Sequence, residues 1–222
     1  MNAEEKWNAI DAYIERMVVG EDEILRAAVE ASAAAGLPPI QVSVSQGKFL
    51  HLLARIQNTR KALEIGTLGG YSSIWLARAL PEGGKLITLE LSAKHAEVAR
   101  ANINRAKLTG RVDLRVGPAI DILPRLEAEG CGPFDFIFID ADKPGTPQYF
   151  EWALKLSRRG SVIVVDNVIR HGALLDENRT DPAVQGMLRF TRMLAAESRV
   201  SGTVIQTVGS KGHDGFAVLV VN

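Results

Sequence analysis

Residues 62–73 read ALEIGTLGGYSS, and this stretch contains the pattern that decides the fold. A short apolar run, Ala62–Ile65, is followed by a glycine-rich turn and then by an amphipathic stretch near 72–80. This order predicts a strand, a tight turn and a helix. Because a strand that leads into a helix is the first half of a βαβ unit, we expect a parallel sheet to be built around this stretch.

The same alternation continues toward the C-terminus. Four further apolar runs are expected to be strands: Leu86–Leu89, Val112–Val116, Phe134–Ile139 and Val162–Val165. Amphipathic stretches near 93–108, 118–128 and 147–158 are expected to be the helices between and after them. Continuous apolar runs are typical of strands that are buried on both faces. The sequence therefore predicts an α/β, Rossmann-like core with helices on both sides of five parallel strands.

The two ends of the chain are expected to add to this core. Residues 1–57 read as helical, and we interpret them as an N-terminal helical cap on a Rossmann-like core of residues 58–222. A helix is expected from Asp181-Pro182 to about Ser198, followed by strands near Thr203–Val208 and Phe216–Val221. The glycine-rich linker Gly209–Gly215 is too short for a parallel crossover. We therefore predict a seven-stranded, mostly parallel sheet that ends in an antiparallel hairpin.

The composition narrows the class of protein. Lysine plus arginine and aspartate plus glutamate both number 26, and the resulting zero net charge argues against a broad surface for nucleic acid. The lone cysteine, Cys131, cannot form an internal disulfide. No apolar run approaches the roughly 20 residues that span a bilayer. We expect a cytoplasmic protein that does not enter membranes.

The glycine-rich turn and the acid after the second strand predict a ligand that contains adenosine. Glycines let a backbone pass close to a ligand, and Glu90 could accept hydrogen bonds from both ribose hydroxyls. A tight turn beside an exposed acid is the simpler alternative. The G-x-G-x-x-G fingerprint of dinucleotide sites is missing, and Glu64 would lie badly beside a pyrophosphate. An acid suits a positively charged ligand, which favours S-adenosylmethionine over NAD.

Oxygen ligands follow two of the predicted strands. Asp140 comes after one strand, and Asp166 and Asn167 come after the next. The carboxyl ends of parallel strands share one edge of the sheet, so these side chains should meet near Gly66 and Glu90. An all-oxygen set suits Mg²⁺, Mn²⁺ or Ca²⁺ rather than zinc or copper. Helix capping and salt bridging are the alternative roles for such acids.

Four segments resemble a known family: ALEIGTLGGYSS at 62–73, FDFIFIDADK at 134–143, VVDNV at 164–168 and DGFAVLVV at 214–221. The chain is similar to the cation-dependent O-methyltransferases of the caffeoyl-coenzyme-A and catechol type and their bacterial relatives. The resemblance implies a class I methyltransferase fold, a homodimer, and a small hydroxyl acceptor such as a catechol. It implies an S-adenosylmethionine site at Val42, Glu64, Gly66, Thr67, Ser72, Glu90, Ala119 and Asp140. It also implies a cation on Asp140, Asp166 and Asn167.

The resemblance further assigns roles near the acceptor. It places Lys143 at the reacting hydroxyl, where it could act as general base, and Asp142 and His171 at the substrate. A salt bridge to Asp140 or Asp142 is the alternative role for Lys143. The chain departs from the plant pattern at Pro144–Thr146 and at Arg170-His171. Both segments would border the acceptor, so the plant substrate is not carried over.

Three rival functions remain at the level of sequence. A tRNA modified-nucleoside O-methyltransferase would need a basic surface, for which Arg158-Arg159 and the stretch from Lys107 to Arg115 are the candidates. A NAD-dependent oxidoreductase could use the same general fold. A non-catalytic binding protein would be expected to lose the proposed cation ligands or Lys143, and the chain keeps all four.

Overall fold

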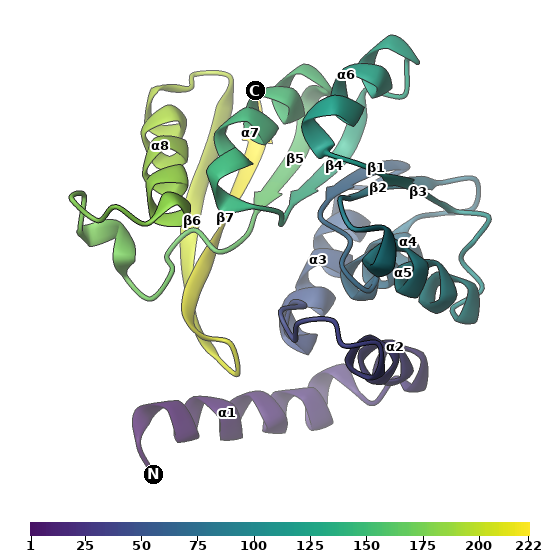
Figure 1. Cartoon of the computed structure of the whole chain (residues 1–222), viewed down its shortest axis with the longest axis vertical. Helices are drawn as coiled ribbons and strands as arrows, with labels where there is room; N and C mark the ends of the chain where they lie inside the picture. Colours follow the sequence, from purple (N-terminus) through teal and green to yellow (C-terminus); the bar gives the residue numbers. More distant parts are fainter.

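The computed structural model describes all 222 residues, which form one seven-stranded sheet in the order β3-β2-β1-β4-β5-β7-β6 (Figure 1). The strands are β1 (Lys61–Ile65), β2 (Lys85–Glu90), β3 (Val112–Val116), β4 (Phe134–Ile139), β5 (Ser157–Val165), β6 (Val200–Gly209) and β7 (Gly212–Val221). Strands β1 to β5 pair in parallel, and β7 lies antiparallel between β5 and β6. The predicted fold class is confirmed.

Helices cover both faces of the sheet (Figure 1). The α-helices are α1 (Ala3–Ile14), α2 (Glu23–Ala34), α3 (Val44–Ile56), α4 (Tyr71–Ala79), α5 (Ala93–Arg105), α6 (Ala119–Ala128), α7 (Thr146–Lys155) and α8 (Pro182–Ala196). Shorter segments are a π-helical turn at Glu15–Val19 and 3₁₀ turns at Lys143–Gly145 and Ala173–Leu175. Side chains at the start of several helices accept backbone N–H bonds, as Ser43 does for α3 and Asp181 for α8.

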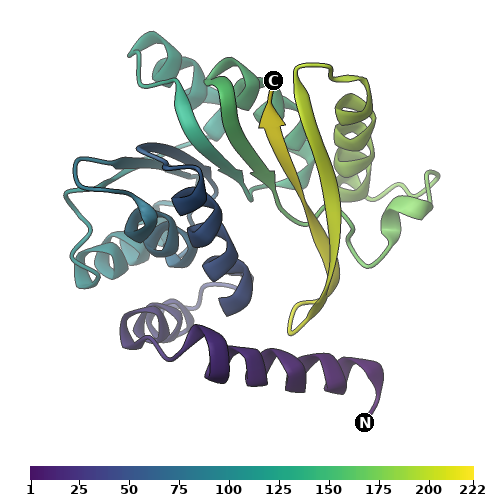
Figure 2. The ribbon, with the colours of Figure 1, turned by 180° about the vertical axis from the view of Figure 1, so that it is seen from behind.

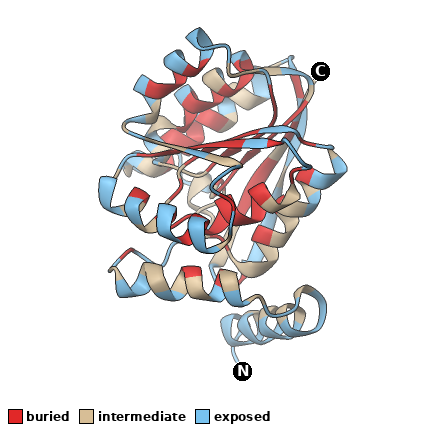
Figure 3. Ribbon diagram, turned by 90° about the vertical axis from the view of Figure 1, so that its right-hand side faces the viewer, coloured by how far each residue is buried: buried red, intermediate tan, exposed pale blue.

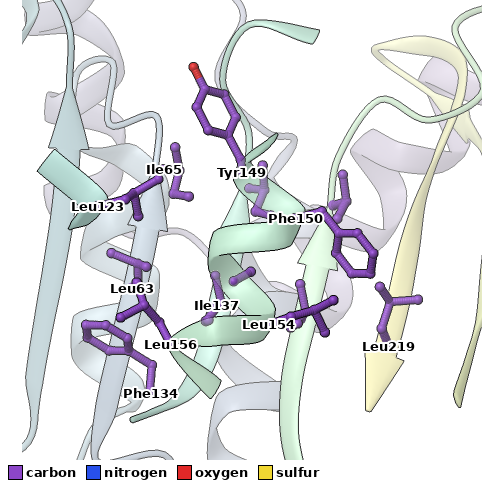
Figure 4. Close-up of a cluster of buried hydrophobic side chains, with 14 of the residues drawn as sticks. Leu63, Ile65, Leu123, Phe134, Ile137, Tyr149, Phe150, Leu154, Leu156 and Leu219 are labelled. Carbon is purple, nitrogen blue, oxygen red and sulfur yellow. The ribbon is translucent and has the colours of Figure 1, made fainter. Parts of the chain in front are cut away.

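The core consists of two apolar layers, one on each face of the sheet (Figure 3). Figure 4 shows side chains of one of them, the layer beneath α6 to α8. Successive side chains of a strand point to opposite faces. Along β4, Phe136 and Phe138 therefore join the layer beneath α2 to α5, while Ile137 and Ile139 join the layer beneath α6 to α8. Both faces are covered, which explains why the strands read as continuous apolar runs.

The N-terminal residues do not form a separate layer. Leu50 and Ala54 of α3 are fully buried in the same apolar layer as α4 and the sheet. In contrast, α1 has no buried residue and lies across the far end of the β6–β7 hairpin (Figures 1, 2 and 3). There the Ser210 N–H donates to Asp11 Oδ2 at 2.7 Å. No helix combines the length and apolar character that crossing a membrane requires.

Two predicted boundaries are wrong. The helix expected at 147–158 ends at Lys155, because Ser157 already pairs with Phe134 and begins β5. The loop expected at Gly209–Gly215 is mostly strand, since pairing between β6 and β7 continues to Gly209 and Gly212. This end of the hairpin extends beyond the parallel sheet (Figure 2). Its residues are therefore polar and do not show the apolar pattern that predicts a strand.

The strand order sets the place where a ligand can bind. β1 lies between β2 and β4, so the chain leaves β1 toward one side of the sheet and later returns on the other. At such a switch in direction, the loops after the two strands separate and leave a crevice at the carboxyl ends.

Candidate active site

A cavity of about 580 Å³ lies at this switch in strand order. Its walls come from the loops after β1, β2, β3, β4 and β5, together with the segment before α3 and part of β7. Among the predicted site residues, those lining it are Val42, Gly66, Thr67, Ser72, Glu90, Ala119, Asp140, Asp142, Lys143 and Asn167. Residues far apart in the sequence thus meet at one edge of the sheet.

The glycine-rich turn is required by packing as well as by the cavity. Gly66 has φ +103, and a Cβ there would lie 2.0 Å from the carbonyl oxygen of Asp140. A Cβ on Gly69 would lie 2.1 Å from Ser32 Oγ of α2. Gly70, with φ +82, occupies the N-cap of α4. Glycine at position 66 therefore lets the ends of β1 and β4 lie close together at the cavity, and glycine at position 69 lets the turn pack against α2.

Glu90 ends β2 at the cavity wall and is fixed by backbone donors. Its Oε2 accepts the Leu68 N–H at 2.7 Å, and its Oε1 accepts the Ser92 N–H at 2.9 Å. His95 Nδ1 lies 3.4 Å from Oε1 and also lines the cavity. Each carboxylate oxygen keeps a second lone pair, so Glu90 can still accept hydroxyl groups from a ligand.

Glu64 does not line the cavity, although it lies only two residues before Gly66. Its side chain is fully buried and accepts hydrogen bonds from Ser73 and, at 2.6 Å, from Thr88. Its Oε1 is buried without a hydrogen-bond partner. Burial raises the pKa of Glu64 to about 7, although these hydroxyl donors oppose the shift. A nearby positive group is what this carboxylate lacks.

The predicted cation ligands meet where β4 and β5 end. Asp140 and Asn167 line the cavity, and Asp166 is buried beside them without an ion-pair partner. Burial and the neighbouring charge of Asp140 raise the pKa of Asp166. Two adjacent carboxylates and an amide form a donor set that a hard divalent cation would satisfy. No three His, Cys, Asp or Glu side chains lie together in a way that could hold a metal ion. The proposed trio contains only two residues of these types, because its third ligand is an asparagine.

The loop that carries Asn167 is organised by Asp214 of β7. Asp214 Oδ2 accepts from Asn167 Nδ2 at 3.2 Å. Asp214 Oδ1 accepts backbone N–H groups of Ile169, Arg170 and Gly215, at 3.1, 2.9 and 2.9 Å. Because the amide nitrogen of Asn167 faces Asp214, its oxygen remains available for another partner. The donor set therefore fits a cation in orientation as well as in chemistry.

Lys143 and Asp142 follow β4 at the other side of the cavity mouth. Lys143 Nζ lies 2.8 Å from Asp140 Oδ1, so the salt bridge considered for it is present. Asp142 accepts the Gly145 N–H at 2.9 Å and the Tyr149 hydroxyl at 2.5 Å. Burial, together with this bond to Asp142, raises the pKa of Tyr149. Asp142 thus positions a turn and a tyrosine as well as bordering the cavity.

Three predicted residues lie outside the cavity wall, and several lining residues were not predicted. Glu64 and Asp166 are buried behind it, and His171 lines a second, smaller cavity. The unpredicted side chains include His95, Tyr149 and Asp214, whereas Arg170 belongs to a segment that was expected to border the acceptor. His95 could have been found from its place one turn into the helix after Glu90. No pattern in the sequence marks Tyr149.

Known proteins match this chain in sequence and in fold. The model of a family described as O-methyltransferase matches residues 15–216. A catechol O-methyltransferase from Niastella koreensis is 56% identical over 97% of this chain and 97% of its own. A crystal structure of an O-methyltransferase from Bacillus cereus in complex with SAH is 56% identical, has a TM-score of 0.97, and matches over 98% of this chain and 99% of its own. The O-methyltransferase TomG from Streptomyces achromogenes, involved in tomaymycin synthesis and solved with SAM, is 51% identical with a TM-score of 0.97 over 100% of both chains.

The fold and the cavity at its strand ends define an α/β enzyme with a ligand site at the switch in strand order. The chain belongs to the O-methyltransferase family, and the predicted enzyme class, an S-adenosylmethionine-dependent O-methyltransferase, is confirmed. The rival oxidoreductase and non-catalytic readings are therefore set aside.

Proposed function

We propose that the chain transfers a methyl group from S-adenosylmethionine to a hydroxyl of a small, catechol-like acceptor, with a divalent cation as cofactor. The observation that carries this proposal is the buried Asp166, which forms no ion pair, beside Asp140, with Asn167 at the wall of the same cavity. Catechol O-methyltransferases at 56% and 52% identity support the acceptor class. Mg²⁺ is the proposed ion, and Mn²⁺ or Ca²⁺ would suit the same ligands.

S-adenosylmethionine would lie along the part of the cavity that β1, β2 and β3 border. Glu90 would hold the ribose hydroxyls, and Ala119 would flank the adenine beside Gly117 and Pro118. Val42, Gly66, Thr67, Ser72 and Asp140 would complete the site. Glu64 would act from behind this wall, because its unpartnered Oε1 would be stabilised by the positive charge of the cofactor.

The chemistry divides between the bound groups and the chain's own residues. When bound, the sulfonium supplies the methyl group, and the cation makes the acceptor hydroxyl easier to deprotonate. Asp140, Asp166 and Asn167 would hold the cation. Lys143, which pairs with Asp140 in the structure, would accept the hydroxyl proton on Nζ as the neutral amine, the form that the nearby positive charges of the cation and the sulfonium would favour. The chain's main contribution is alignment of the acceptor oxygen with the methyl carbon.

The acceptor would lie at the cavity mouth near Asp142 and Lys143. His171 would contact it only through the adjoining smaller cavity. We also propose that the chain is cytoplasmic and forms a homodimer. The exposed apolar side chains Ile10, Tyr13, Met17 and Val18, at and just after α1, support a buried contact between copies. Light scattering of the purified protein tests the dimer.

Methyl transfer to catechol and to resorcinol tests the proposed function. We expect catechol to be methylated only with a divalent cation present, with activity lost in EDTA and restored by Mg²⁺. Resorcinol, whose hydroxyls are not adjacent, should be a poor acceptor. Equal activity in EDTA, or no transfer to any hydroxyl acceptor, would overturn the proposal.

A further inference from the structure

A second cavity of about 200 Å³ adjoins the main one and shares Arg170 and Asp214 with it. Most of the residues that line it have ionisable side chains. Besides Arg170 and Asp214, these are His171, Arg179 and Asp181. Of the two shared residues, Arg170 comes three positions after Asn167, and Asp214 of β7 accepts a hydrogen bond from the Asn167 side chain. A group bound here would therefore be next to the place proposed for the reacting hydroxyl.

The two acids of this cavity are engaged by backbone donors. Asp214 Oδ1 accepts three backbone N–H groups, and its Oδ2 accepts the amide of Asn167. Asp181 caps α8, where its Oδ1 accepts the Ala183 and Val184 N–H groups at 2.8 and 3.1 Å. Both carboxylates thus serve to fix the loop and the helix that form the walls.

The two arginines are not engaged in this way. Neither guanidinium, of Arg170 or of Arg179, forms a hydrogen bond or an ion pair. Their positive charges reach Asp181, whose pKa is held low first by its backbone donors and then by both arginines. The guanidinium donors of both arginines are therefore free for a ligand, although the two acids of the cavity balance their positive charge.

The backbone holds Arg170 in an uncommon conformation. Asn167, Arg170 and His171 have φ values of 57°, 49° and 56°, in the left-handed region that non-glycine residues rarely adopt. The hydrogen bonds of Asp214, and one from the His171 N–H to the His213 carbonyl at 2.9 Å, maintain it. Such strain persists where surrounding contacts over-determine it and is concentrated at functional sites. It fixes Arg170 at the boundary between the two cavities.

We propose that the second cavity binds an anionic substituent of the acceptor through Arg170, so that the preferred acceptors are catechols with a carboxylate. The inference rests on the proposed function and names its substrate class. A free guanidinium matches a carboxylate bidentately. About 200 Å³ is the share of roughly six or seven water molecules, which is enough for a carboxylate on a short linker.

The test compares kcat/KM for 3,4-dihydroxybenzoate, its neutral methyl ester and catechol, with S-adenosylmethionine and Mg²⁺. The wild type should prefer the free acid. Arg170→Gln should lower kcat/KM for the acid about 10- to 100-fold, mainly through KM, and change the ester and catechol by no more than about twofold. The Arg170→Asn variant should show the same changes in kcat/KM, because asparagine tolerates the left-handed backbone conformation. The control Arg100→Gln removes an exposed arginine from α5 and should alter none of these values.

Each other outcome is decisive. An equal loss for all three acceptors would mean that Arg170 only maintains the loop, and an unchanged value for the acid would mean that it does not contact the substituent. Either result would overturn this inference while the proposed function stands. If the wild type methylates none of the acceptors, the proposed function fails, and the inference fails with it.

Discussion

Asn167 Nδ2 donates to Asp214 Oδ2 across 3.2 Å, and this contact orients the amide that we propose as a cation ligand. The contact joins the loop after β5 to β7, the only strand between β5 and β6. The antiparallel hairpin thus contributes to the site through a single side chain. Substitution of a residue that orients a metal ligand in this way typically lowers metal affinity about 10- to 100-fold.

Asp214→Asn should therefore weaken cation binding. The amide would lack the second negatively charged oxygen and would oppose the Asn167 amide with its own donor. We expect Mn²⁺ affinity, measured by isothermal titration calorimetry, to fall at least about 10-fold, with a loss of about 1–3 kcal/mol in the free energy of unfolding. Asp113→Asn, on the exposed side of β3, is the control for charge. Unchanged Mn²⁺ affinity would show that Asp214 does not position Asn167.

Lys143→Ala should lower turnover far more than cofactor affinity. A positioned general base contributes about 10²- to 10⁴-fold to rate. Lys143 contacts Asp140 at the cavity mouth, so its removal should leave the affinity for S-adenosylhomocysteine within about threefold of the wild type. The measurements are kcat with catechol and the Kd of S-adenosylhomocysteine, with the exposed Lys6→Ala as control. A kcat equal to that of the wild type would remove Lys143 as the base.

Glu90→Gln should weaken cofactor binding. Two backbone N–H groups donate to the Glu90 carboxylate, and glutamine would place its own amide donor against one of them. Glutamine would also accept hydrogen bonds from the ribose hydroxyls less well. We expect the Kd for S-adenosylhomocysteine to rise about 10- to 100-fold. A Kd within twofold of the wild type would place the ribose elsewhere. Thermal unfolding of the ligand-free variant separates this effect from a loss of stability.

Asp135 should contribute stability that acid removes. Burial alone would raise its pKa, but the N–H groups of Lys61 and Arg60 and the Arg158 guanidinium hold the pKa below its usual value of 3.8. A lowered pKa means that the contribution is complete above the unfolded pKa and is lost as the pH falls through the folded one. Asp135→Asn should cost about 1–3 kcal/mol at pH 7. Denaturant unfolding should show this difference shrinking only below about pH 4; a constant difference down to pH 2 would contradict the assignment.

The strands and the general place of the site could be predicted from sequence because they follow from local rules. Apolar runs mark strands covered on both faces, and parallel strands bring Gly66, Glu90, Asp140 and Asn167 to one edge. Alternation along β1 would also have indicated that Glu64 shares a face with Ala62, beneath α4, and not with the cavity. The negative charge of Glu64, its place before the glycine-rich turn and the family resemblance all favour the cofactor site, but none of them shows which face of β1 the side chain occupies.

The remaining features depend on contacts between distant segments. Arg170 borders both cavities because Asp214, 44 residues later, holds its backbone in the left-handed region. The strand pairing of 209–215 depends on β6 and on contact with α1, and the polar residues there give no strand pattern. Neither feature follows from composition or periodicity.

The most direct test of the central claim compares the wild type with Asp166→Asn for Mn²⁺ binding and catechol methylation. Removing the charge of the buried Asp166 should relieve its repulsion with the neighbouring Asp140, so the variant should be at least as stable as the wild type in EDTA. It should nevertheless lose measurable Mn²⁺ binding and cation-dependent methylation. A folded Asp166→Asn protein that methylates catechol in EDTA at the wild-type rate would contradict a cation site at Asp140, Asp166 and Asn167.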